Sequence, residues 1–80
     1  MNYYHTTHRA KCPNGKLADH YEITISSRHM IQVEDIQSAL DALPPEIYQE
    51  GIADSLRATL GASVKVTGWH YNFRVECVRE

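Results

Sequence analysis

The alternation of apolar and polar residues is clearest in the first third of the chain. Over residues 20–26, Tyr21, Ile23 and Ile25 point one way and the polar residues between them the other, which predicts a β-strand with one buried face. Residues 2–11 are rich in Tyr, Thr and His and contain neither Gly nor Pro, so they predict a first strand. The turn signal Asn14-Gly15 between the two segments makes them a hairpin with a long connection.

The period then changes from two to about 3.6, which predicts two helices. The first helix would bury Val33, Ile36, Leu40 and Leu43. The second would bury Tyr48, Ile52, Leu56 and Leu60. Pro44-Pro45 separates them, because proline disfavours a helical residue before it and suits the first position of a new helix. Gly61 is placed to end the second helix.

Alternation returns at residues 64–69 and again at residues 73–77, which predicts a second hairpin with its turn at residues 70–72. The element order is therefore β-β-α-α-β-β. An α+β fold, with a four-stranded antiparallel sheet and two helices packed on one face, would bury all of these apolar stripes. We expect residues 1–80 to form a single domain of this kind.

Composition narrows the class of protein. The chain has 80 residues, 42% of them apolar and 22% charged, with a net charge of −2, so a globular protein is expected and binding through phosphate neutralisation is disfavoured. The polar start of the chain is unlike a signal peptide, and no apolar run is long enough to span a membrane. Cys12 and Cys77 are too few for a disulfide framework, which favours a cytoplasmic protein, although a single bridge between them stays open.

Candidate chemistry lies in the connection between the first two strands. Cys12 precedes the turn and Asp19 follows it, so a chain reversal would bring a thiol and a carboxyl to one end of the hairpin. Such a pair can act as nucleophile and proton donor. On spacing alone, an ordinary buried cysteine beside a turn aspartate is the commoner arrangement.

These residues and the element order resemble one family. The order is similar to that of the tunnelling fold (T-fold), whose members bind pterins or purines. Cys12-Pro13, five intervening residues and then Asp19 before a strand resemble the motif of the 7-cyano-7-deazaguanine reductases and their amidinotransferase relatives, enzymes of queuosine- and archaeosine-type modification. The resemblance covers most of the chain, from Cys12 to Cys77.

A second match starts the second helix, where Tyr48-Gln49-Glu50 resembles the family's aromatic-His-Glu segment. The resemblance implies that Glu50 binds the guanine-like edge of the ligand, that Gln49 lies beside it, and that Cys12 adds to a nitrile to give a thioimide while Asp19 handles the proton. Gln49 departs from the family by replacing its His. Glu34-Asp35 stand where the reductases carry a Ser/Lys-rich motif linked to NADPH, so an amidinotransferase-like reaction without a cofactor is the favoured prediction.

The resemblance also implies a homo-oligomer, because T-fold pockets form between subunits, and a purine or deazapurine ligand, free or carried in a nucleic acid. A metal site is disfavoured, because His5 and His8 on a strand point to opposite faces. The alternative is a small non-enzymatic interaction module, either inhibitor or adaptor. Convergence of Cys12, Asp19 and Glu50 on one cavity would favour the enzyme, and their dispersal over the surface would favour the module.

Overall fold

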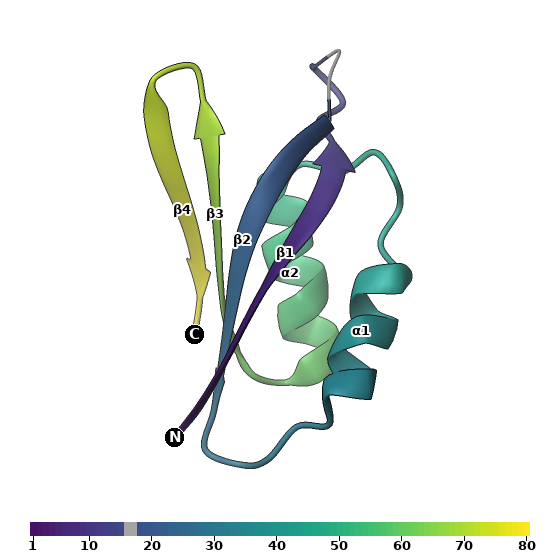
Figure 1. The fold of residues 1–80 in the computed structure, drawn as a ribbon, viewed down its shortest axis with the longest axis vertical. Coiled ribbons are helices and arrows are strands. Elements are labelled where there is room, and N and C mark those ends of the chain that lie inside the picture. The colour runs from purple at the N-terminus through teal and green to yellow at the C-terminus, as the bar shows by residue number, and fades with distance from the viewer. Residues whose placement is uncertain (16–17) are drawn as a thin grey trace.

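The computed structural model describes residues 1–15 and 18–80 and contains the predicted elements in the predicted order (Figure 1). The elements are β1 (Asn2–Lys11), β2 (Ala18–Ser27), α1 (Val33–Asp41), α2 (Gln49–Leu60), β3 (Ser63–His70) and β4 (Phe73–Arg79). All neighbouring strands are antiparallel and their order in the sheet is β1-β2-β3-β4. The two helices pack together against the sheet, with α2 on β3 and β4. The prediction of an α+β fold of T-fold-like architecture is confirmed.

The core forms between the sheet and α2, as the alternation predicted. Ile23 and Ile25 of β2 lie beside Val64 and Val66 of β3, and all four are almost completely buried. Leu56 and Ile52 cover them from α2. Burying a side chain of this size contributes about 1.5–3 kcal/mol, so this layer accounts for much of the favourable free energy of folding.

The start of the second helix was predicted wrongly. Pro45 does not begin the helix: its carbonyl accepts the backbone N–H of Lys11 at 2.9 Å, and the N–H of Ile47 donates to the carbonyl of Lys11 at 3.0 Å. The segment after the two prolines thus pairs with the end of β1 and satisfies backbone groups there. Helix α2 begins only at Gln49.

This shift changes which side chains the helices bury. Tyr48 precedes α2 and is 50% exposed, whereas Gln49 takes the first inward position and is 5% exposed. In α1, Val33 is 60% exposed and Leu43 lies beyond the end of the helix, where it is half-buried against the core. The central positions of both apolar stripes were predicted correctly, and Leu43 and Leu60 at their ends pack against the core, but Val33 and Tyr48 at their starts are exposed.

The connections also differ slightly from the prediction. The β-turn after β1 is centred on Pro13-Asn14, one residue earlier than predicted, because the N–H of Gly15 donates to the carbonyl of Cys12 at 2.9 Å. The β3–β4 turn is shorter than predicted: His70 still belongs to β3, and Tyr71 adopts a positive φ of 55°. Gly61 ends α2 with a φ of 63°, as predicted. Within the described residues, no helix is both long and apolar enough to cross a membrane.

Candidate functional site

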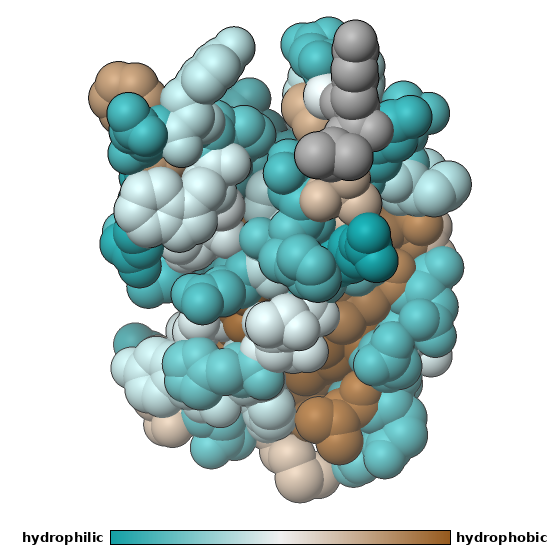
Figure 2. All heavy atoms as spheres, turned by 45° about the horizontal axis from the view of Figure 1, so that its top comes forward, coloured by the Kyte–Doolittle hydropathy of each residue, from teal (hydrophilic) through white to brown (hydrophobic). Residues whose placement is uncertain are grey.

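A cleft of about 380 Å³ opens at one end of the sheet, where β1 and β3 end and α2 begins. Figure 2 looks toward this end and shows a hollow between the projecting tip of the β3–β4 hairpin and the end of the β1–β2 hairpin. The described residues that line the cleft are Cys12, Asn14, Tyr48, Gln49, Glu50, His70, Val75 and Cys77. Three regions that are far apart in the sequence therefore meet here: the turn after β1, the start of α2 and the β3–β4 hairpin.

Cys12 is held at the cleft by the backbone on both sides of it. The preceding residue, Lys11, is tied through its N–H and its carbonyl to the segment that leads into α2. The carbonyl of Cys12 itself accepts the β-turn hydrogen bond from Gly15. The cysteine is a free thiol and is half-buried, so its sulfur is both positioned and accessible. A nucleophile needs both properties.

Glu50 reaches the cleft from the first turn of α2, and its side chain is exposed. A carboxylate at this position is favoured by the positive end of the helix dipole. Close packing explains the glycine at the neighbouring position 51, because a Cβ on Gly51 would lie 3.0 Å from Cγ1 of Ile47. The glycine therefore lets the segment before α2 pack closely on the helix.

Gln49 joins three elements from the floor of the cleft. Its side-chain Nε2 donates to the carbonyl of Val66 on β3 at 2.9 Å and to the carbonyl of Val75 on β4 at 2.8 Å. Its Oε1 lies 2.9 Å from Nε2 of His70. Both N–H donors of the amide are thus used within the protein, which leaves only a lone pair of Oε1 for a ligand.

Asp19 does not line the cleft. It is the second residue of β2, lies opposite Ala10 of β1 and is half-buried. Asp19 lies two residues before Tyr21 on β2. Burial, followed by the charges of Asp19 and Cys12 and the approach of the Asp19 carboxylate to the phenol, raises the pKa of Tyr21 to about 12. No hydrogen bond of normal geometry reaches the buried Tyr21 hydroxyl from the described residues. Cys12 and Glu50 therefore share the cleft, while Asp19 is not among the residues that line it.

Cys77 also lines this cleft, where the sequence indicated only a core position. It is 7% exposed and is a free thiol, like Cys12. Burial, together with the nearby charge of Glu50, raises the pKa of the Cys77 thiol. A raised pKa leaves less thiolate near neutral pH, which lowers the reactivity of Cys77.

Sequence reasoning did not assign His70 and Tyr48 to the site. The segment Trp69-His70-Tyr71 suggests an aromatic turn, and only the register of the β3–β4 hairpin places His70 on the helix side of the sheet. Tyr48 was assigned to the core because it continues the spacing of the helix stripe. The signal for Tyr48 in the sequence is its place in the Tyr48-Gln49-Glu50 segment, next to the predicted ligand-binding residues.

Elsewhere in the described structure, a second pocket or a metal site could compete with the cleft as the functional site. A larger hollow of about 710 Å³ lies at the opposite end of the sheet and contains none of the predicted site residues. In the part of the chain that the structure describes, no three His, Cys, Asp or Glu side chains are grouped so that they could hold a metal ion. The smaller cleft is therefore where the candidate chemistry gathers.

The fold and the cleft together define the class: an α+β protein of T-fold-like architecture with a thiol and a carboxylate at one end of its sheet. The crystal structure of the archaeosine synthase QueF-Like in the apo form is similar to this chain, with a TM-score of 0.83 at 19% sequence identity. The match covers 98% of this chain and 89% of that one, and it confirms the predicted fold. No protein-family profile and no curated protein sequence matches the chain.

Proposed function

We propose that this protein binds a 7-deazaguanine nitrile and forms a thioimide with it through Cys12. The observation that carries the proposal is the meeting of Cys12 and Glu50 in one cleft, although 38 residue numbers separate them (50 − 12). The shared fold with an archaeosine synthase supports a ligand of the 7-deazaguanine class. The cleft, at about 380 Å³, is large enough for a purine-sized molecule.

The reaction uses the residues in separate roles. The sulfur of Cys12 adds to the nitrile carbon, one π bond of the nitrile breaks, and its electron pair moves to the nitrogen, which takes up a proton. The carboxylate of Glu50 accepts hydrogen bonds from the ring N–H and amine of the base. A site of this kind rejects analogues that lack these donors, because a bound analogue would cover the carboxylate without giving it a hydrogen-bond partner. Asp19, close to Tyr21, is the candidate for relaying a proton to the nitrogen.

The thioimide would react with ammonia rather than with hydride. Glu34 and Asp35 lie exposed in the first turn of α1 and repel a phosphate-bearing cofactor. Addition of NADPH to protein and nitrile should therefore leave the cofactor absorbance unchanged. Its steady loss would instead identify a reductase.

The first prediction is a covalent adduct on Cys12. Incubation of the wild type with excess 7-cyano-7-deazaguanine near neutral pH should add one ligand mass to the intact protein, because an activated nitrile reacts with a positioned thiolate. Cys12→Ala should show no addition. Cys77→Ala is the matched control and should keep the adduct, since the raised pKa of Cys77 makes it the less reactive thiol. An unmodified wild type, shown to be folded, would contradict the thioimide.

The second prediction concerns Glu50. Glu50→Ala should weaken binding of the deazaguanine ligand by about 100-fold or more, since charged hydrogen-bond partners in a site contribute about 1.5–3 kcal/mol each. Because the side chain is exposed, the thermal midpoint should change little. Glu34→Ala, an exposed glutamate in the first turn of the other helix, is the control and should bind like the wild type. Equal affinities in calorimetry for Glu50→Ala and the wild type would exclude the proposed role.

A protein-interaction module is the second candidate, because large apolar side chains are exposed at the tip of the β3–β4 hairpin. Trp69 is 61% exposed, Tyr71 99% and Phe73 72%. None of these three side chains lines the cleft that contains Cys12. Failure of both the adduct and the Glu50 experiment would leave the module as the better account.

A further inference from the structure

The orientation of the Gln49 amide follows from its two buried partners. The carbonyl oxygens of Val66 and Val75, at 2.9 Å and 2.8 Å, can only accept hydrogen bonds. The atom that faces both of them must be the NH₂ nitrogen, because an amide oxygen would face two acceptors without a proton to share. The side-chain oxygen of Gln49 is therefore the atom that faces His70.

That orientation determines the protonation of the His70 ring. Nε2 of His70 lies 2.9 Å from an oxygen that can only accept, so Nε2 must carry a proton. In the neutral ring the other nitrogen, Nδ1, is then unprotonated and is the basic atom. The Gln49 amide thus holds the imidazole in a single tautomer. The hydrogen bond on Nε2 fixes the proton there and leaves Nδ1 free to accept a proton.

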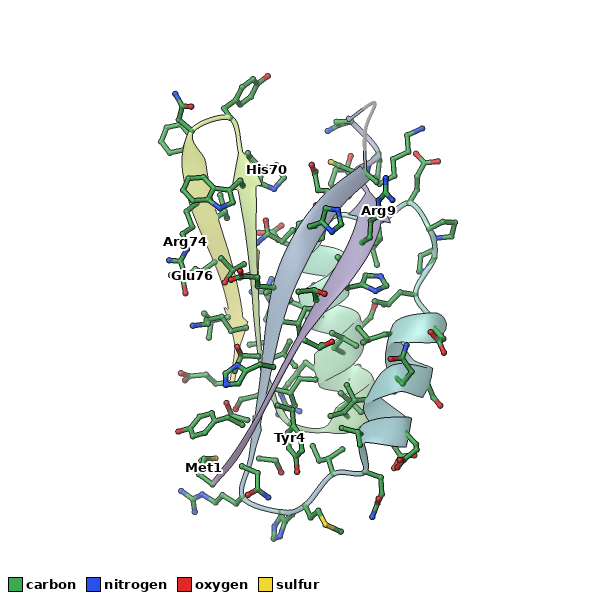
Figure 3. All side chains as sticks on the ribbon, viewed as in Figure 1. Met1, Tyr4, Arg9, His70, Arg74 and Glu76 are labelled. Carbon is green, nitrogen blue, oxygen red and sulfur yellow. The ribbon has the colours of Figure 1, made fainter. Side chains whose placement is uncertain are left out.

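The ring lies where such a base can act. His70 is the last residue of β3, is half-buried and lines the cleft together with Cys12. Figure 3 shows its side chain directed from the end of β3 toward the β1–β2 side of the molecule. The other titratable groups that line this cleft are Tyr48 and Glu50 at the start of α2 and Cys77 of β4.

We propose that His70 is the proton acceptor for the Cys12 thiol, with Gln49 as its positioning residue. The Sγ–H proton passes to Nδ1 directly or through one water while the sulfur attacks an electrophilic carbon. With a nitrile, the S–C bond forms, one C–N π bond breaks, and the nitrogen receives one proton as the imidazolium loses one. No electrons are gained or lost overall.

The nitrile step rests on the proposed function, so the test measures the thiol separately. Cys12 is alkylated with iodoacetamide near neutral pH, and its rate is followed by peptide mass mapping, which separates Cys12 from Cys77. His70→Gln keeps a side-chain N–H donor near Gln49 but has no basic nitrogen, and alkylation of Cys12 should slow by about 100-fold. His70→Ala should be equally slow, and added imidazole should restore its rate. His20→Ala, which removes an exposed histidine of β2, is the control and should react like the wild type.

The outcomes separate this inference from the proposed function. Fast, His70-dependent alkylation without a nitrile adduct supports the base and rejects the deazaguanine nitrile as substrate. A nitrile adduct that forms equally fast in His70→Gln and the wild type supports the substrate and overturns the base. Imidazole nitrogen chemical shifts of the wild-type protein give a test without any variant. A neutral His70 ring protonated on Nδ1 instead of Nε2 would overturn the inference.

Discussion

At Tyr21, the packing of the ring in the core conflicts with the need of its hydroxyl for a hydrogen bond. Its ring is completely buried and packs against Gly68 of β3, where a Cβ would lie 2.6 Å from two ring carbons. That packing sends the hydroxyl into a region without a hydrogen-bond partner among the described residues. A buried, unpaired hydroxyl costs roughly 1–3 kcal/mol. The ring therefore stabilises the fold while its hydroxyl opposes that stability.

The third prediction follows from this conflict. Tyr21→Phe keeps the ring and removes the unpaired hydroxyl, so urea unfolding at neutral pH should show a gain of about 1 kcal/mol. Tyr71→Phe, at a side chain that is 99% exposed, is the control and should leave stability unchanged. A clear loss of stability in Tyr21→Phe would mean that the hydroxyl has a partner in solution.

The same residue predicts a pH dependence. The folded state holds the Tyr21 proton up to a pKa of about 12, because of burial and then of Asp19 and Cys12, whereas the unfolded residue loses it near 10. The unfolded state thus binds fewer protons between these values, so wild-type stability should fall as the pH rises from about 10 to 12. Urea unfolding of Tyr21→Phe over the same window should show a smaller fall.

At the scale of elements, Gln49 fastens the start of α2 to the β3–β4 hairpin. The helix packs on both strands, and one buried side chain donates to the backbone of each. An apolar residue at this position could not donate a hydrogen bond to either carbonyl. The polar residue at the first buried position of α2 is therefore part of the packing as well as of the cleft.

The fourth prediction tests this connection. Gln49→Glu replaces a double donor by a group that can only accept when ionised, and it should reduce the free energy of unfolding by about 3–5 kcal/mol. Gln37→Glu is the matched control in α1, where the exposed amide bonds only Asp41 at 2.9 Å. It should cost no more than about 0.5 kcal/mol. Similar unfolding midpoints in urea for the two variants would show that the Gln49 bonds are unimportant.

The whole molecule has two open sheet edges and uncovered apolar surface. β1 and β4 form the edges of the sheet, and open edges are sites for pairing with another chain. Figure 2 shows a hydrophobic band along the side of the molecule where α1 lies. On the other face of the sheet, Arg74 and Glu76 form an exposed ion pair at 3.0 Å, which Figure 3 shows pointing outward from β4.

The fifth prediction is a homo-oligomer built through these edges. Light scattering at micromolar concentration should give a mass well above 9.1 kDa. Phe73→Lys, at the exposed start of β4, should lower that mass by placing a charge at the joint between subunits. Thr59→Lys, at an exposed position of α2, is the control. A constant monomer mass over a wide concentration range would contradict this assembly.

The sequence by itself determined the element order and the central core positions. The predicted core positions include Ile23, Ile25, Ile52 and Leu56. Strand alternation and helical spacing place each of them on the apolar face of its element, and that face is buried. Cys12 and Glu50 could be proposed as site residues because short motifs carry their chemistry locally. The ends of the helices could not be predicted as well. Pro45 has the local preference for a helix start, but its carbonyl accepts a hydrogen bond from Lys11 of β1 instead.

Only the tertiary structure decided which residues share the cleft. His70, Cys77 and Gln49 meet there because the register of the β3–β4 hairpin and the packing of α2 bring together segments that are distant in the sequence. Asp19 lies opposite Ala10 at the same end of the β1–β2 hairpin as Cys12, but it is not among the residues that line the cleft. Hydrophobic spacing reports which face of an element is buried, but it carries no information about which polar groups meet across elements. The tautomer of His70 depends on such a meeting, with a glutamine whose amide is oriented by two carbonyls of the sheet.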